Sequence, residues 1–167
     1  MIHGDNPFAP SEDSPLRRFR GRLASPVTII TAGDEMTRTG LTVSSLLVVE
    51  GDPPMVQAVV TPGSDLYDVA AGSGRFVVHI CDGGSSGLAD VFAGIRPSPG
   101  GLFASVETEQ TDFAPVLTSL SNRLFCKTMS VGEAGWSGLL VGQVETVDVT
   151  SLEDPLVYFR GSYRRLD

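Results

Sequence analysis

The apolar residues of the chain occur in short runs that are bounded by glycine, proline and acidic turns. Several runs are rich in valine, isoleucine and threonine, which favours strands over helices. We expect strands in segments 26–33, 40–50, 55–61, 75–80, 102–110, 122–131 and 138–149, and in segment 155–166, which would end in a short tail. Short turns separate the first three of these strands, and this spacing predicts an antiparallel meander.

The segment GLTVSSLLVVE, residues 40–50, departs from the alternation of an ordinary strand. Three hydroxyl residues, Thr42, Ser44 and Ser45, lie inside an otherwise apolar run. Small hydroxylated residues allow a flat, polar ligand to approach closely, and they can hydrogen-bond its heteroatoms. The alternative is that they bond only to neighbouring strands. In a continuous strand Ser44 and Ser45 point to opposite faces, so we expect one of them to contribute most to ligand binding. We favour Ser44 because it shares its face with Thr42.

Three segments carry the signals of short helices. A serine followed by a proline at residues 14–15 starts a helix that reaches about Leu23. Segment 64–74 begins with a capping serine and an acidic first turn, and Gly72 or Gly74 can end it. Segment 85–94 predicts a third short helix, which stops at its final glycine.

This combination of many strands and few short helices indicates a mainly β (α+β) fold. A β-barrel with inserted helices fits the order of the elements better than an alternating βαβ fold. The length of 167 residues suits one domain with a sizeable core. We assign residues 14–167 to this domain and residues 1–13 to an N-terminal arm that we expect to be poorly ordered.

The charge of the chain argues against several classes of partner. The formal net charge is -8 and the isoelectric point is near 4.6, which disfavours nonspecific binding to nucleic acid or to anionic membranes. The arginines gather in segments 17–22 and 160–165, near the two ends of the chain. An anionic ligand held by the middle of the chain would therefore need those ends, a partner subunit or backbone amides.

Cysteine and histidine usage gives little support for metal or disulfide chemistry. Cys81 and Cys126 both lie in apolar, strand-like runs, so we expect two buried free thiols. The chain has two histidines and no CxxC pair, so a His-rich metal site is excluded. The polar N-terminal segment does not resemble a signal peptide, and no apolar run approaches the length of a membrane span. A cytoplasmic protein is the default expectation.

Other local motifs can be explained by structural roles. GGSSG at residues 83–87 matches a serine-nucleophile pattern, but both histidines precede Ser85, so the usual hydrolase order is impossible and a connection with a helix cap is preferred. No dinucleotide-binding or Walker glycine motif follows a strand. His79 is interpreted as a core histidine with one hydrogen bond, or alternatively as a ligand contact. Trp136 lies in a turn where it could cover a site or pack locally.

Taken in order along the chain, the motifs resemble the flavin reductase-like family, whose fold is the FMN-binding split barrel. The match runs from residue 16 to residue 166. Its most specific parts are a G-x-T-x-S-S strand that leads to D-P-P, an R-F-x-V strand, an L-A-x-x-F-A-G helix and a Y-x-R-G-x-Y-R end. The resemblance implies a homodimer with a flavin in a groove near the interface.

The resemblance also implies a set of cofactor-binding residues. The strand against the flavin ring corresponds to Thr42, Val43, Ser44 and Ser45, and the phosphate loop and the bordering helix correspond to Ser64, Asp65, Leu66 and Phe92. Trp136 and Ser137 correspond to the nicotinamide side.

Three positions depart from the family pattern. The loop after the third strand has no basic residue and offers Asp65 instead. Val91 stands where an arginine often precedes the helix phenylalanine, and Ser137 stands where the family often has a histidine.

The function that the resemblance implies is an NAD(P)H-dependent flavin reductase. It would use FMN or FAD with NADH or NADPH and would supply reduced flavin to a separate flavin-dependent oxygenase, without a catalytic acid or base of its own. Two alternatives remain open. One is a flavin- or deazaflavin-binding protein without nicotinamide-dependent reductase activity, and the other is a cofactor-free dimeric binding protein.

Overall fold

We analysed a computed structural model that describes residues 14–61 and 63–166. The predicted arm, residues 1–13, lies outside the described residues. The helices are α1 (Pro15–Gly21), α2 (Asp65–Ser73) and α3 (Ser86–Phe92). The strands are β1 (Ser25–Pro26), β2 (Thr28–Ala32), β3 (Thr39–Val43), β4 (Leu46–Val49), β5 (Met55–Val60), β6 (Arg75–Ile80), β7 (Thr108–Gln110), β8 (Pro115–Leu117), β9 (Arg123–Ala134), β10 (Ser137–Asp148), β11 (Leu156–Phe159) and β12 (Ser162–Arg165).

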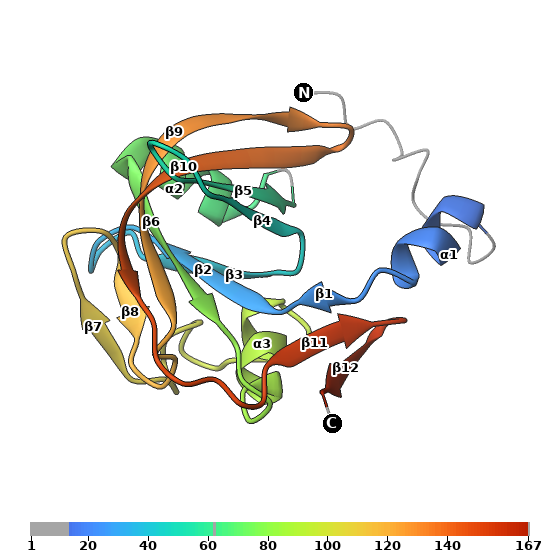
Figure 1. The fold of residues 1–167 in the computed structure, drawn as a ribbon. Helices are drawn as coiled ribbons and strands as arrows, with labels where there is room; N and C mark the ends of the chain where they lie inside the picture. Colours follow the sequence, from blue (N-terminus) through green and yellow to red (C-terminus); the bar gives the residue numbers. More distant parts are fainter. Residues whose placement is uncertain (1–13, 62, 167) are drawn as a thin grey trace.

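Seven strands form one strongly curled antiparallel sheet in the order β3-β2-β6-β9-β10-β5-β4 (Figure 1). The two edge strands, β3 and β4, are consecutive in the sequence and are separated only by Ser44 and Ser45. The curl therefore brings the two edges of the sheet together at this pair of serines. The Ser45 carbonyl accepts a hydrogen bond from the Val59 amide of β5 at 2.9 Å. The fold is the mainly β half-barrel that the sequence predicted.

The predicted single strand over residues 40–50 is wrong in one respect, because it breaks at Ser44. Its first half pairs with β2 and its second half pairs with β5. The first three predicted strands therefore do not form a simple meander, since β3 and β4 occupy opposite edges of the sheet. The hydroxyls interrupt the apolar pattern here, but such an interruption does not show that the strand ends, so the sequence did not reveal the break.

The interior of the barrel is filled from the inward face of each strand. Along β10 the buried positions alternate regularly, as the pleat requires. Two of them are glycines, because aromatic rings lie over them: a Cβ at Gly138 would come within 2.7 Å of the Tyr67 ring, and a Cβ at Gly142 would overlap the Phe76 ring. Tyr67 belongs to α2, which packs against β2 and β3, and its hydroxyl donates to the Gly132 carbonyl at 3.3 Å.

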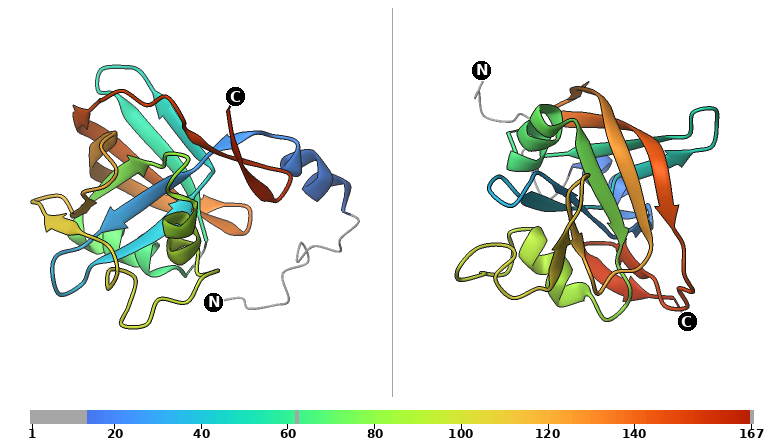
Figure 2. Two further views of the ribbon diagram at one scale, coloured as in Figure 1. Left: turned by 90° about the horizontal axis from the view of Figure 1, so that it is seen from below. Right: turned by 90° about the vertical axis from the view of Figure 1, so that its left-hand side faces the viewer.

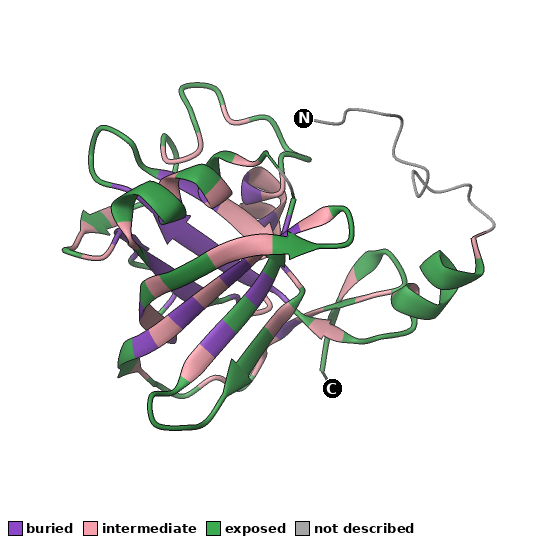
Figure 3. Cartoon of the chain, turned by 90° about the horizontal axis from the view of Figure 1, so that it is seen from above, coloured by how far each residue is buried: buried purple, intermediate pink, exposed green. Residues whose placement is uncertain are grey.

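Capping chemistry starts two of the helices, α1 and α2, as predicted. Ser14 accepts a hydrogen bond from the Arg17 amide at 3.5 Å, and Pro15 follows it. Ser64 accepts from the Tyr67 amide at 3.4 Å, and Gly74 ends α2 with a left-handed φ of 72°. The helix α1 stands apart from the curled sheet and buries no residue (Figure 3).

Two smaller sheets lie beside the barrel (Figure 2). Strands β1, β11 and β12 form one of them, so the predicted C-terminal strand and tail is a hairpin. Strands β7 and β8 form the other. The predicted strand over residues 102–110 is confirmed only at its end, and β8 was not predicted because it is short and begins with a proline.

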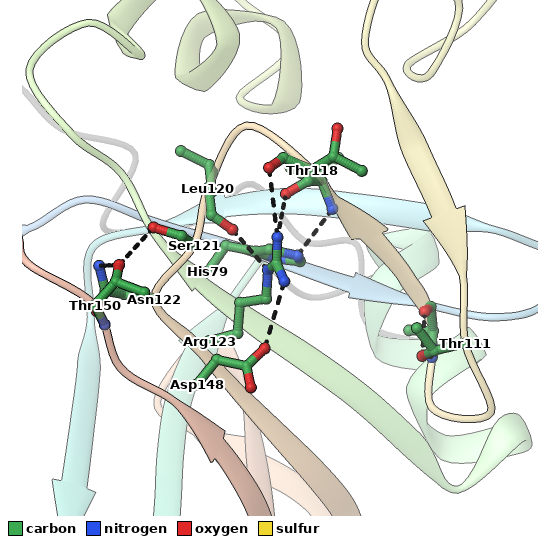
Figure 4. A network of polar contacts seen from close by, with 11 residues as sticks. His79, Thr111, Thr118, Leu120, Ser121, Asn122, Arg123, Asp148 and Thr150 are labelled. Atoms are coloured by element: carbon green, nitrogen blue, oxygen red, sulfur yellow. Dashed lines mark hydrogen bonds and ion pairs between the residues drawn. The ribbon is translucent and has the colours of Figure 1, made fainter.

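A polar network ties β6 and β9 to the loop that follows β8 (Figure 4). His79 is fully buried, with Nδ1 at 3.0 Å from the Ile29 carbonyl and Nε2 accepting from the Leu117 amide at 3.1 Å. Nδ1 is therefore the protonated nitrogen, and the ring is neutral. The guanidinium of Arg123 donates to the Leu120 carbonyl at 2.6 Å and pairs with Asp148 at 3.4 Å. The core interpretation of His79 is confirmed.

Candidate functional site: a groove between the first helix and the barrel

A groove lies between α1 and the open side of the barrel, and we call it the α1 groove. Its volume is about 1460 Å³. Its walls come from α1 and the segment leading into β1, from the start of β4, from β5, from the start of β10, and from the turn between β11 and β12. Typical pockets for small molecules measure about 300–1,000 Å³, so this groove has room for an extended ligand.

One wall contains the break between β3 and β4. Ser44 and Ser45 line the groove, with Leu46 and Leu47 continuing along β4. Ser44 is half-buried and Ser45 is exposed. Both serines line the groove, and the strand ends at Val43. The continuous strand from which we expected one serine to dominate is therefore not present. The hydroxyls lie where backbone pairing changes from β2 to β5, so they can serve a ligand as donors or acceptors.

An aromatic residue and a hydroxyl lie on another wall, at the turn between β9 and β10. Trp136 and Ser137 line the groove there, and Gln57 and Leu139 lie on the strands beside them. Trp136 is 43% exposed. The structure therefore brings the predicted nicotinamide-side residues and Ser44 and Ser45 to one groove.

The third wall is basic. Five arginines line the groove: Arg17, Arg18, Arg20, Arg22 and Arg160. The first four lie in or directly after α1, and the fifth lies in the turn between β11 and β12. No lining residue in the described part of the chain is acidic. This agrees with the expectation that an anionic ligand would use the ends of the chain.

Two predicted residues of β3 do not line the groove. Val43 is buried in the core of the barrel. Thr42 donates from its hydroxyl to the Ala89 carbonyl of α3 at 2.6 Å, so its hydroxyl already has a partner. The alternative from the sequence was a bond to a neighbouring strand, and the partner is instead a helix.

The residues predicted around the phosphate lie elsewhere as well. Leu66 and Phe92 are 1% exposed and belong to two core clusters, so their side chains do not reach the groove. Ser64 caps α2, and Asp65 lies exposed in the first turn of that helix. The groove extends along β5 as far as Thr61, three residues before Ser64.

Three titratable side chains outside the groove are buried. Burial lowers the pKa of His79 to about 4 and raises the pKa of both Cys81 and Cys126 to about 12. Both cysteines are free and buried, as predicted. Ser85 stands at the start of α3, but its hydroxyl donates to Asp82 at 2.6 Å and does not cap the helix.

Within the described ranges, no cluster of three or more His, Cys, Asp or Glu side chains could hold a metal ion. No described helix has the length and apolar character needed to cross a membrane.

The sequence did not place the arginines of α1 at the same groove as Ser44. Their signal was present, because four arginines within six residues are unusual in an acidic chain. The sequence did not show where these arginines lie, because their position depends on how the barrel closes at Ser44 and Ser45 and on the pairing of β1 with β11.

The fold and the groove define a class of protein: a half-barrel whose groove is lined by hydroxyls, an aromatic ring and arginines. Within that class, the family model described as "Flavin reductase like domain" matches residues 20–167. The chain therefore belongs to the flavin reductase-like family.

Relatives support the same membership. The chain is 30% identical over 145 residues to the "4-hydroxyphenylacetate 3-monooxygenase, reductase component" of Thermus thermophilus, a match that covers 87% of this chain and 91% of the relative. It is 24% identical over 166 residues to the "FMN reductase (NADH) RutF" of Variovorax paradoxus, a match that covers 99% of this chain and 91% of the relative. The solved structure of the flavin reductase PheA2 superposes with a TM-score of 0.83 at 25% identity, covering 93% of this chain and 99% of that chain.

Proposed function

We propose that the protein is an NAD(P)H-dependent flavin reductase that works in the α1 groove. It binds FMN or FAD, takes a hydride from NADH or NADPH, and supplies reduced flavin to a separate oxygenase. Membership of the flavin reductase-like family supports the class of activity. The name of the Thermus relative, a reductase component of a monooxygenase, supports the role as a supplier. The name of the Variovorax relative supports FMN and NADH.

The observation that carries the proposal is the meeting of Ser44 and Ser45 with Trp136 and Ser137 at one groove. The serine pair joins the two edge strands β3 and β4, whereas Trp136 and Ser137 lie at the hairpin of β9 and β10, distant in the sequence. Small hydroxyls at a break in backbone pairing leave space for a flat ring, and the tryptophan gives it an aromatic contact. The residues present therefore fit a flavin.

When bound, flavin and nicotinamide carry the hydride transfer themselves, and the protein supplies binding and orientation. Ser44, Ser45 and Gln57 can hydrogen-bond the polar edge of a ring system. Leu47, Leu139 and Trp136 offer apolar surface that excludes water. The described residues that line the groove include no histidine, aspartate or glutamate, the side chains that most often transfer protons.

One observation favours a second candidate function. Ser137 stands where the family often has a histidine, and His79, the histidine within the described residues, is buried in the network around Arg123. A serine can donate a hydrogen bond to a nicotinamide amide but carries no charge. The second candidate is therefore a flavin- or deazaflavin-binding protein that lacks nicotinamide-dependent reductase activity.

Two measurements on the purified protein separate the candidates. Titration with FMN and FAD, followed by flavin fluorescence, tests binding. Oxidation of NADH and NADPH in the presence of each flavin tests reduction. We expect both to be positive. Binding without oxidation of either nicotinamide supports the second candidate, and the absence of flavin binding supports a cofactor-free binding protein and contradicts the proposal.

We also propose that the protein is a homodimer. The apolar side chains Leu16, Phe19 and Leu23 of the α1 region are 66%, 63% and 55% exposed, and Leu47 and Val48 of β4 are 58% and 51% exposed. Exposed apolar surface on two sides of a groove is typical of a subunit interface. A second copy of the chain would cover it and complete the groove. Sedimentation that shows a monomer at micromolar concentration would contradict this proposal.

A further inference from the structure

The charges around the α1 groove are distributed unlike those of the whole chain. The protein has 20 acidic and 12 basic residues. Yet the described residues that line the groove include five arginines and no aspartate or glutamate. The groove is therefore a local positive region on a protein of net charge -8.

These arginines are not neutralised by the described part of the chain. The ion pairs found in residues 14–61 and 63–166 join Arg123 to Asp148 and Arg165 to Asp154. Neither pair involves an arginine of the groove. Four like charges within six residues of one helical segment repel each other, and a bound anion would relieve that repulsion.

Backbone contacts hold the fifth arginine beside the end of α1. The Arg160 amide donates to the Gly21 carbonyl at 3.0 Å. Arg160 has a φ of 52° and Gly161 has a φ of 78°, as a two-residue turn between antiparallel strands requires. Few residues with a side chain adopt this conformation. The turn therefore fixes an arginine next to α1 at a position where glycine, asparagine or aspartate would be usual.

We propose that the arginines of α1, together with Arg160, bind the phosphate or diphosphate group of the nucleotide that occupies the groove. This inference rests on the proposed function for the identity of the nucleotide. A guanidinium group can hold two phosphate oxygens at once, and a cluster of arginines suits a diphosphate. The groove of about 1460 Å³ also leaves room for more than a flavin ring beside Ser44 and Ser45.

The start of α2 is less suited to the phosphate, although the family resemblance implies it. Asp65 and Asp68 both lie in the first turn of that helix. Their carboxylates already interact favourably with the helix dipole and repel a second anion. The basic wall of the α1 groove is the better match for a phosphate in this chain.

The test compares two double variants of equal charge change with the parent protein. Arg18→Gln with Arg22→Gln removes two groove arginines that lie four positions apart, on one face of the helical segment. Arg96→Gln with Arg164→Gln is the matched control, because both residues are exposed and neither lines the groove. Since α1 buries no residue, we expect both variants to melt at the temperature of the parent. If the first variant does not fold, Arg160→Gln replaces it.

The first probe is inorganic pyrophosphate, titrated by calorimetry at low ionic strength, which requires no reductase activity. We expect the parent and the control to bind it, and the groove variant to bind it at least about tenfold more weakly, a factor that corresponds to about 1.4 kcal/mol. The absence of binding by the parent, equal affinity in all three proteins, or an equal loss in both variants would overturn the inference. If only the groove variant loses pyrophosphate affinity, but the parent does not oxidise NADH or NADPH, the proposed function fails and the anion site stands.

The second set of probes identifies the source of the phosphate. If the arginines hold the flavin nucleotide, the groove variant loses affinity for FMN or FAD and keeps its affinity for riboflavin. If they hold the nicotinamide nucleotide, flavin affinity is unchanged and the KM for NADH or NADPH rises. The groove variant could instead bind nucleotides and pyrophosphate like the parent but no longer bind an oxygenase. That result would overturn the inference and indicate a protein-docking surface.

Discussion

Lowering the pH should destabilise the protein through His79. This side chain is fully buried between the Ile29 carbonyl, to which it donates, and the Leu117 amide, from which it accepts. The contact with the Leu117 amide requires the neutral ring, whereas a protonated ring could still donate to the Ile29 carbonyl. Protonation would turn Nε2 into a donor facing another donor, and it would place a positive charge near the guanidinium of Arg123. Burial is the main cause that lowers the pKa of His79 to about 4, and the charge of Arg123 lowers it further.

The size of the effect follows from the two pKa values. The unfolded chain has the ordinary value of 6.5 and the folded protein has a value of about 4. As the pH falls, the unfolded chain therefore takes up the proton first, and the free energy of unfolding decreases between about pH 6.5 and about pH 4. The full loss is about 3 kcal/mol, of which about 2 kcal/mol is lost by about pH 5. A domain that is stable by roughly 5–15 kcal/mol would lose a large fraction of its stability.

The assay is urea denaturation of the parent and of His79→Gln at about pH 7 and about pH 5. A glutamine amide can donate to one backbone group and accept from the other, but it does not titrate in this range. Carboxylates contribute equally to both proteins, so the difference between the two pH dependences isolates His79. We expect the parent to lose about 2 kcal/mol more than the variant. Equal pH dependence in the two proteins would refute the reasoning.

The packing and the cysteines give two further predictions. Gly142→Ala should destabilise the protein by about 1–3 kcal/mol, because the added methyl group overlaps the buried Phe76 ring. The control Gly132→Ala, with no atom within 4 Å of its added Cβ, should stay within about 0.5 kcal/mol of the parent in the same denaturation assay. Cys81 and Cys126 should resist alkylation at neutral pH until the protein unfolds, because burial raises the pKa of each thiol to about 12. Rapid alkylation of the native protein, detected by mass, would contradict this prediction.

Local patterns predicted the elements whose causes are local. The helix that starts after Ser14 and the helix between Ser64 and Gly74 follow from capping chemistry within a few residues. The long strands β9 and β10 follow from sustained apolar patterns over many positions. The general architecture, a curled antiparallel sheet with short helices, follows from the number and order of such segments together with the family resemblance.

Features that depend on closure of the sheet could not be predicted in this way. The serines interrupt the apolar pattern between β3 and β4, but the pattern does not show that the two halves pair with different strands, β2 and β5. Strand β8 contributes only three residues and gains its order from pairing with β7. The turn at Arg160 and Gly161 did carry a local signal, a glycine between two strand-like runs, which could have indicated the final hairpin.

The same division holds for the candidate site. Ser44, Ser45, Trp136 and Ser137 were predicted, and they do line one groove. Leu66 and Phe92 were assigned from motif positions, but in the folded chain they contribute to the core. Whether a residue near a motif faces the ligand or the interior depends on which face of its element meets the barrel. The motif alone does not contain that information.

The central claim is that the break between β3 and β4 forms part of a flavin site. The measurement that tests it most directly is titration of FMN and FAD, by fluorescence quenching, into Ser44→Leu, Ser45→Leu and the control Ser130→Leu, with a thermal melt of each. Ser130 is an exposed serine of β9 that does not line the α1 groove. We expect both groove variants to melt like the control and to bind flavin at least about tenfold more weakly than the parent. The reason is that a leucine fills space that the flavin ring needs. Parent-like affinity in both groove variants, or a loss of affinity only in proportion to a loss of stability, would contradict the central claim.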